Sequence, residues 1–252
     1  MKKILNHLLI VLVCCGLSTQ TFAQNKKAPN FQEGTITYEI QVEGVPEVSQ
    51  FINGTELTVL FKDQLSKMDI GIMGGLAKFQ FISNVQDKLY TVLMDVPTFY
   101  EKTAVPIDLE HQMFKDLKEK QPNQAPIKKA EKPEIQYNKK KRKKIAKYRC
   151  YSAEMDMESG VGDRMVVYLT DKIRPAAQSE MQRQVGAMDG YPLGFEMLMG
   201  GAKITIMAKS VKKESLEKEL FEVPANYSEK SLDEIKEELQ EKFGLDGKDI
   251  GL

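Results

Sequence analysis

The sequence GTITYEIQVE (residues 34–43) alternates apolar and polar side chains, and its apolar positions are filled by β-branched or aromatic residues. This period of two is typical of a β-strand with one buried face. The same pattern predicts strands at residues 57–61, 67–72, 78–83, 88–95 and 98–103. Turn-forming residues separate them, notably Asp63-Gln64 and Gly74-Gly75. Short strands joined in this way indicate an antiparallel meander rather than alternating β-α-β units.

A second run of strands is predicted at residues 144–158, 164–170, 193–199 and 202–210. Helices are predicted at residues 106–120, 175–186 and 231–243, and the first and last of these show a helical apolar period. In the last of these, Ser231 and Glu234 form a capping box. Leu232, Ile235, Leu239 and Phe243 then make one apolar stripe. We therefore predict an α+β fold, a large curved antiparallel sheet with helices packed on one face and a C-terminal helix.

The N-terminus has the features of a cleavable secretory signal peptide over residues 1–23. Lys2 and Lys3 precede the apolar run LLIVLVCCGL (residues 8–17), and Thr21-Phe22-Ala23 places small residues before a cut at Gln24. Ten apolar residues are too few to cross a bilayer as a helix. We then expect a flexible lead-in at 24–33, one β-rich domain at 34–227 with a helical insertion and basic loop (106–149), and a C-terminal helix and tail at 228–252. The expected location is periplasmic or secreted.

Four segments together resemble a family of secreted Bacteroidota domains of unknown function related to the GLPGLI proteins. They are GTITYE (34–39), KIAKYRC (144–150), GYPLG (190–194) and LFEVPANY (220–227). Lys147 and Asn226 stand where that family usually has glycine. The broader group is similar to the periplasmic lipoprotein-carrier (LolA-like) fold. The resemblance implies a half-barrel sheet whose concave face is covered by helices, and it carries no catalytic residues to this chain.

Catalytic and metal-binding patterns are weak in this sequence. After cleavage Cys150 and His111 are the single cysteine and histidine, so no internal disulfide can form. They are also too few for a common zinc ligand set. Asp156, Glu158 and Asp163 flank a glycine turn, but their spacing does not match a calcium loop. We expect no enzyme activity, no metal and no cofactor.

The strongest charge feature is a run of six cations: Lys139, Lys140, Lys141, Arg142, Lys143 and Lys144. The chain has 36 basic and 36 acidic residues, so this run is a local asymmetry rather than a global field. It could bind an anionic membrane surface, because each nearby cation attracts anionic headgroups. Alternatively, it is a solvated loop or a strand edge protected against pairing. Nucleic acid is not an expected partner, because stacking aromatics are not interleaved with the cations.

Methionines recur on or beside the predicted strands. Met155, Met157, Met197 and Met199 would share a face by the period-two rule, and flexible thioethers adapt to irregular apolar ligands. One hypothesis is therefore a lipid or lipoprotein carrier that holds a lipid-like or acylated ligand on the concave sheet. The other is a structural or interaction module of the periplasm or outer membrane with a filled core and no small ligand. The sequence leaves the oligomeric state open.

The signal-peptide assignment predicts the N-terminus of the exported protein. We expect it to begin at Gln24 and to stay in solution without detergent, because residues 8–17 are the most membrane-like segment. Intact mass measurement of the exported form tests this. A form that retains residues 8–17, or that carries acyl mass on Cys14 or Cys15, would contradict the assignment.

Overall fold

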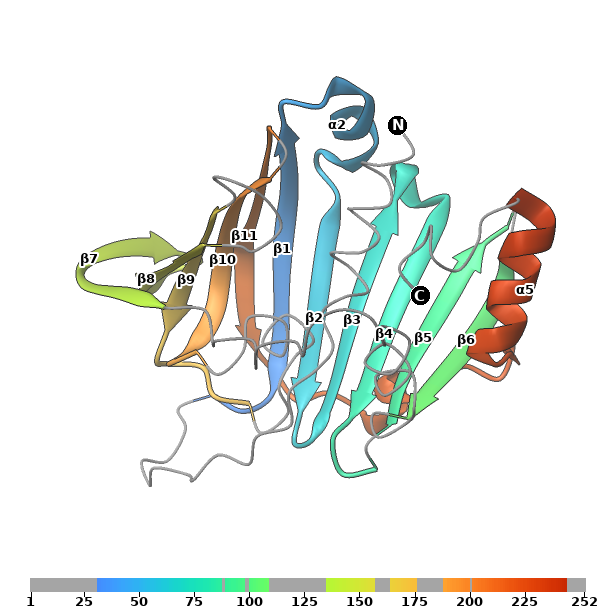
Figure 1. Ribbon diagram of the computed structural model, residues 1–252. Helices are drawn as coiled ribbons and strands as arrows, with labels where there is room; N and C mark the ends of the chain where they lie inside the picture. The colour runs from blue at the N-terminus through green and yellow to red at the C-terminus, as the bar shows by residue number, and fades with distance from the viewer. Residues whose placement is uncertain are drawn as a thin grey trace, which may run out of the picture.

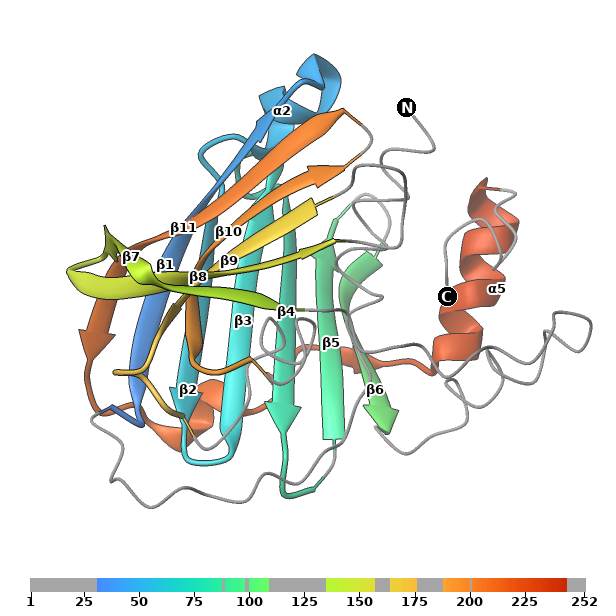
Figure 2. The ribbon, with the colours of Figure 1, turned by 60° about the vertical axis from the view of Figure 1, so that its left-hand side comes forward.

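The computed structural model describes residues 31–87, 89–97, 100–108, 135–156, 164–175, 188–199 and 201–243. These residues form one open, strongly curved sheet of twelve strands (Figures 1 and 2). Its strand order is β12-β6-β5-β4-β3-β2-β1-β11-β10-β9-β8-β7. All neighbours are antiparallel except the short parallel pair β12-β6. The predicted α+β class with a curved antiparallel sheet is confirmed.

The N-terminal half of the sheet is the predicted meander. It comprises β1 (Gly34–Glu43), β2 (Glu56–Lys62), β3 (Leu65–Ile72), β4 (Ala77–Asn84), β5 (Leu89–Val96) and β6 (Tyr100–Asp108). The predicted start of a helix at Pro106 is wrong, because residues 106–108 continue β6 opposite residues 89–91 of β5. Val105 and Ile107 keep the period of two there and pack with the C-terminal helix. The remainder of the predicted insertion, from residue 109 to residue 134, lies outside the described residues.

The C-terminal half contains β7 (Gln136–Ile145), β8 (Tyr148–Asp156), β9 (Arg164–Thr170), β10 (Tyr191–Met199) and β11 (Ala202–Lys213). The segment predicted as one strand from Lys144 is two strands, since the chain turns at Ala146 and Lys147. The segment predicted to contain a basic loop forms an edge strand, β7, which pairs with β8, as in the strand-edge alternative for the cationic run. The helix predicted at residues 175–186 lies almost wholly outside the described residues.

Two helices and two 3₁₀ turns of the described residues lie around the sheet. They are α2 (Pro46–Ile52), which the sequence pattern did not predict, the 3₁₀ turns η1 (Met73–Gly75) and η2 (Lys218–Phe221), and α5 (Leu232–Phe243). The remaining strand, β12, is Ser228–Glu229. The predicted capping box at α5 is confirmed, because the Glu234 N–H donates to Ser231 Oγ at 3.2 Å and the Ser231 N–H donates to the Glu234 carboxylate at 2.6 Å. Leu232 and Ile235 then pack against β5 and β6.

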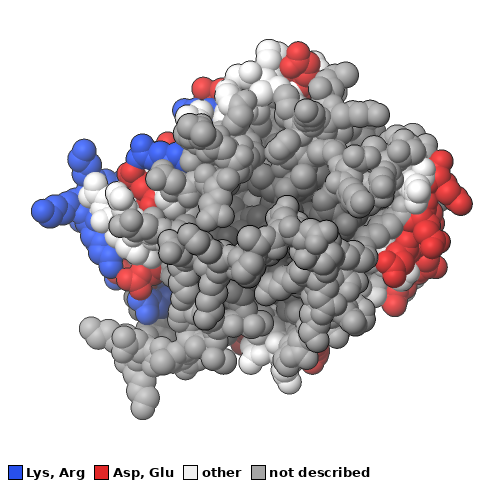
Figure 3. All heavy atoms as spheres, in the orientation of Figure 1, with Lys and Arg blue, Asp and Glu red and all other residues white. Residues whose placement is uncertain are grey.

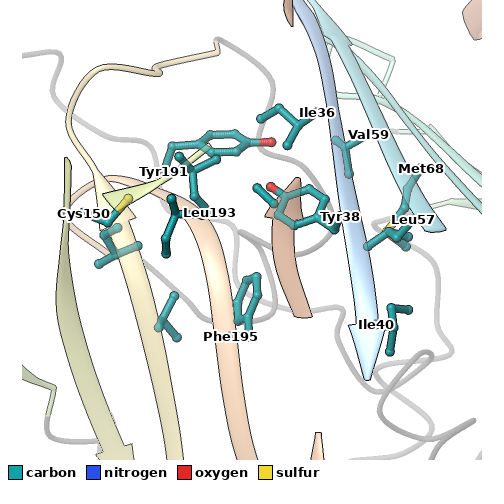
Figure 4. Close-up of a cluster of buried hydrophobic side chains, with 14 of the residues drawn as sticks. Ile36, Tyr38, Ile40, Leu57, Val59, Met68, Cys150, Tyr191, Leu193 and Phe195 are labelled. Carbon is teal, nitrogen blue, oxygen red and sulfur yellow. The ribbon is translucent and has the colours of Figure 1, made fainter. Parts of the chain in front are cut away.

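The core lies on one face of the sheet, which we call the inner face. In β1 the buried positions Ile36, Tyr38, Ile40 and Val42 alternate with the less buried threonines, Glu39 and Gln41. The residues directly opposite these positions on the neighbouring strands are also mostly apolar. The apolar face therefore continues from β1 to β11 on one side and through β2 and β3 to β4 on the other. Figure 4 shows side chains of β1–β3 and of β10 pointing toward one another across the curve of the sheet. Curvature therefore brings the apolar side chains of the two halves of the sheet together in one core.

One end of this core is filled by aromatic rings. The ring of Phe61 lies 5.3 Å from that of Phe31 and 5.8 Å from that of Tyr191, measured between centroids. The Tyr38 hydroxyl donates to the Pro192 carbonyl at 2.8 Å. Burial raises the pKa of Tyr38 well above its usual value, so the hydroxyl stays protonated and keeps donating. We call this set the aromatic end.

The β7–β8 turn generates a stability prediction. Ala146 and Lys147 have φ values of 44° and 74°, as a two-residue hairpin loop requires, but both carry a Cβ that disfavours this backbone. Replacing them together (Ala146→Asn, Lys147→Gly) should raise the free energy of unfolding by about 1 kcal/mol. Denaturant unfolding measures the change. Lys147→Ala is the control for lost charge and should give no comparable gain, so a loss of stability in the Asn-Gly variant would contradict the strained turn.

Candidate functional site

A row of methionines crosses the inner face in the C-terminal half of the sheet. Met155 of β8 lies directly opposite Met165 of β9, and Met165 lies directly opposite Met197 of β10. The row continues through Ile204 of β11 to Val42 of β1. The three methionine side chains are 6%, 9% and 7% exposed, respectively. We call these five residues the methionine row.

The structure places the predicted methionines in different ways. Met155 and Met197 belong to one row, and the buried positions of β8 alternate as expected at Tyr151, Ala153 and Met155. Met199 is the last residue of β10, opposite Ala202. Met157 lies outside the described residues. Two of the four candidate positions are therefore brought together across a third strand.

Met165 connects them, and the sequence reasoning missed it. Its strand was predicted at residues 164–170, and the observed bounds of β9 are the same. However, period two shows only that Met165 shares a face with Val167 and Leu169. Its place between Met155 and Met197 depends on the registers of two strand pairs, which the alternation does not specify.

The methionine row differs chemically from the aromatic end. Each side chain in the row is apolar and offers no strong hydrogen-bonding group. The next row on the same face, Ala153, Val167, Phe195, Ile206 and Ile40, is also apolar. The aromatic end instead holds the hydroxyls of Tyr38 and Tyr191. An apolar group that met the row would meet adaptable thioethers and aliphatic side chains.

The six predicted cations all lie on β7, the outermost strand at one edge of the sheet. Their side chains are exposed (Figure 3). Lys139 pairs with Asp189 at 3.1 Å, and Lys143 pairs with Glu196 at 3.1 Å. The Lys143 ammonium also lies 4.2 Å from the centroid of the Tyr168 ring. These contacts attach β7 to the rest of the sheet.

Gly194 makes room for this attachment. A Cβ at Gly194 would lie 2.5 Å from Met207 Sδ, 3.2 Å from the Tyr168 ring and 3.3 Å from Ile145 Cδ1. Ile145, the last residue of β7, therefore packs where β10 has no side chain. The GYPLG segment accordingly contributes a space for the hairpin as well as a strand.

The described residues bring together no obvious catalytic group. Cys150 is fully buried, and burial raises the pKa of its thiol to about 11. His111, Glu158 and Asp163 lie outside the described residues. Within the described part, no three His, Cys, Asp or Glu side chains gather closely enough to hold a metal ion. No helix in that part is long and apolar enough to cross a bilayer.

Comparison with known proteins finds structural similarity but no family match. No family model matches the chain, and no curated protein sequence matches it. A conserved uncharacterised protein from Thermus thermophilus has a TM-score of 0.44 at 10% identity, covering 79% of this chain and 90% of that chain. The relation to the GLPGLI proteins therefore stays a hypothesis.

Two other similar structures carry lipoprotein descriptions. A putative outer membrane lipoprotein-sorting protein domain from Vibrio parahaemolyticus has a TM-score of 0.33 at 14% identity, with 75% of this chain and 89% of that chain covered. The Mycobacterium tuberculosis lipoprotein LppX has a TM-score of 0.32 at 10% identity, with 73% and 89% covered. At these TM-scores the similarities do not bear on function.

The burial of Cys150 predicts a chemically inert thiol. At pH 8 a thiol of pKa about 11 has roughly two hundredfold less thiolate than free cysteine, whose pKa is about 8.5. Iodoacetamide should therefore label Cys150 in guanidinium but barely in the native protein, as followed by mass spectrometry. Native labelling at the rate of free cysteine would show instead that the thiol is accessible and activated.

Proposed function

We propose that the protein is an exported cell-envelope binding protein that holds a lipid-like or acylated ligand on its inner face. The methionine row is the proposed contact surface, and the proposed function involves no catalysis, metal or cofactor. The observation that carries the proposal is the direct alignment of three buried methionines across β8, β9 and β10. A location in the periplasm or beyond, and kinship with the secreted Bacteroidota domains, are parts of the same proposal.

The chemistry of the row supports an apolar ligand. A polar ligand in this position would lose hydrogen bonds to water and find no replacement in the side chains of the row. An acyl chain has no such requirement, and unbranched thioethers can rearrange around chains of different shape. The aromatic end suits this role less well, because its rings contact each other and the Tyr38 hydrogen bond is already made.

A structural module without a small ligand is the second candidate. The low exposure of the three methionines favours it, because side chains packed to interior density need no other partner. In that case the inner face is only the core of the sheet, and the protein acts through its outer surface. The two candidates differ in whether an acyl chain can reach the side chains of the methionine row.

Enlarging the row distinguishes the two candidates. We expect wild-type protein to bind a fluorescent fatty-acyl probe, and Met155→Phe with Met197→Phe to abolish that binding by filling the space for the chain. Probe fluorescence and denaturant unfolding are measured on the same preparations. Because the added volume enters space that an acyl chain can occupy, the free energy of unfolding should change by less than about 1 kcal/mol.

Met68→Phe is the matched control. Met68 is a buried inner-face methionine of β3, opposite Val59 and Phe81 and outside the row. Its enlargement should cost about 1–3 kcal/mol of stability by overpacking and leave probe binding intact. A wild type that ignores the probe, together with row variants that lose as much stability as Met68→Phe, would establish the structural candidate instead.

A further inference from the structure

The segment from Lys139 to Arg149, which we call the basic hairpin, concentrates positive charge at one edge of the sheet. It contains eight Lys or Arg residues and no acidic residue. It comprises most of β7, the two-residue turn and the start of β8. In Figure 3 these basic side chains project from one side of the molecule.

Three of its lysines stand outside the strand ladder. Asn138 lies opposite Ser152, and the next paired residue on β7 is Arg142, opposite Tyr151. Lys139, Lys140 and Lys141 therefore form a bulge with no partner residues on β8. The Lys141 N–H donates to Asn138 Oδ1 at 3.2 Å, which closes the bulge on itself. This geometry presents consecutive lysines at the surface rather than alternating them between two faces.

The cations divide into two groups by their contacts. Lys139 and Lys143 are ion-paired to Asp189 and Glu196, and the Arg142 guanidinium lies 5.2 Å from the Tyr151 ring centroid. The others have no ion pair among the described residues; they are Lys140, Lys141, Lys144, Lys147 and Arg149. The first group attaches the hairpin to the sheet, and the second group is available to an external anion.

The register also opposes two like charges. Lys144 of β7 lies directly opposite Arg149 of β8, and both side chains are exposed. Directly opposed like charges destabilise a strand pair. Protection of a sheet edge needs charged side chains, but it does not need cations to face each other across a ladder. An anion that contacts both side chains would convert this repulsion into attraction.

We propose that the basic hairpin docks on the anionic phospholipid headgroups of a membrane surface. Lysine ammonium groups act as point charges without fixed hydrogen-bond geometry, and here they project outward instead of lining a groove. That arrangement suits a plane of many headgroups better than one shaped acidic peptide. The proposal does not rest on ligand binding at the methionine row, because vesicle docking is measured without a ligand.

The charge at the opposite edge supports this orientation. Helix α5 exposes Asp233, Glu234, Glu237 and Glu241, and Figure 3 shows acidic side chains gathered on that side. The described residues thus place positive and negative surfaces at opposite edges of the sheet. Near an anionic membrane the basic edge is attracted and the α5 edge is repelled, so the protein would approach with its basic hairpin first.

Vesicle co-sedimentation at low salt tests the proposal. The exported protein should bind phosphatidylcholine vesicles that contain phosphatidylglycerol and should ignore pure phosphatidylcholine vesicles. Lys140→Gln, Lys141→Gln and Lys144→Gln together should lower the partition coefficient about a hundredfold, about fivefold for each cation. The matched control removes the same charge from exposed lysines elsewhere, as Lys78→Gln, Lys213→Gln and Lys218→Gln, and should retain most of the binding.

The variant Lys144→Glu tests whether a loss of vesicle binding comes from lost charge or from misfolding. The new carboxylate would face Arg149, so the thermal unfolding midpoint should rise while vesicle binding falls. The proposal is overturned if the wild type ignores anionic vesicles, or if the control triple variant loses as much binding as the hairpin variant. It is also overturned if polyglutamate, at matched charge concentration, displaces the protein from vesicles, because the hairpin would then favour an acidic polypeptide. Inorganic phosphate at the same concentration should not displace it.

Discussion

The pairing of β1 with β11 holds the two halves of this protein together. β1 pairs with β2 on one side and with β11 on the other, from Gly34 opposite Lys213 to Glu43 opposite Lys203. Without the β1–β11 ladder, the N-terminal meander and the C-terminal strands would be separate sheets, each with an exposed apolar face. At the register shift between Thr37 and Tyr38, Lys209 of β11 has no partner on β1, while β1 keeps its own alternation and Tyr38 is fully buried.

That ladder also joins two chemically different regions, the aromatic end and the methionine row, on one face of the sheet. The inner-face residues near the start of β1, such as Ile36 and Tyr38, belong to the same cluster as the rings of the aromatic end. Near its other end, Val42 continues the methionine row through Ile204. Lys62 adds a connection beside the aromatic end, because its ammonium group donates to both Glu33 Oε1 and the Leu216 carbonyl at 2.6 Å. The contacts between aromatic rings therefore lie at one end of the core, and the three aligned methionines of the methionine row lie at the other.

The fold was largely predictable where one face of a strand is buried. In β1 and β9, burial alternates along the strand, and the sequence pattern located both closely. In β7 nearly every side chain is exposed, from Gln136 to Lys144, so no alternation exists to detect. Pairing with β8 imposes the strand, and that is a long-range effect. Helix α2 was missed for a related reason, since among its seven residues only Ile52 is buried.

The candidate site was predictable as a set of residue types but not as an arrangement. Alternation selected Met155 and Met197, whereas the alignment of both with Met165 depends on how β8, β9 and β10 are shifted against one another. The cationic run was evident in the sequence. The bulge at residues 139–141 and the opposition of Lys144 to Arg149 were not, because they depend on the shifted register of β7 against β8.

Strand β8 connects the two proposed surfaces. Arg149 lies near its start in the basic hairpin, and Met155 lies near its end in the methionine row. Six residues of extended strand span about 20 Å, so the two surfaces are separated by less than the thickness of a bilayer core. If both proposals hold, docking through the hairpin keeps the methionine row near the membrane without burying it there. A carrier would gain from that arrangement, because an acyl chain could move between membrane and sheet over a short path while the protein is held by reversible, salt-sensitive contacts.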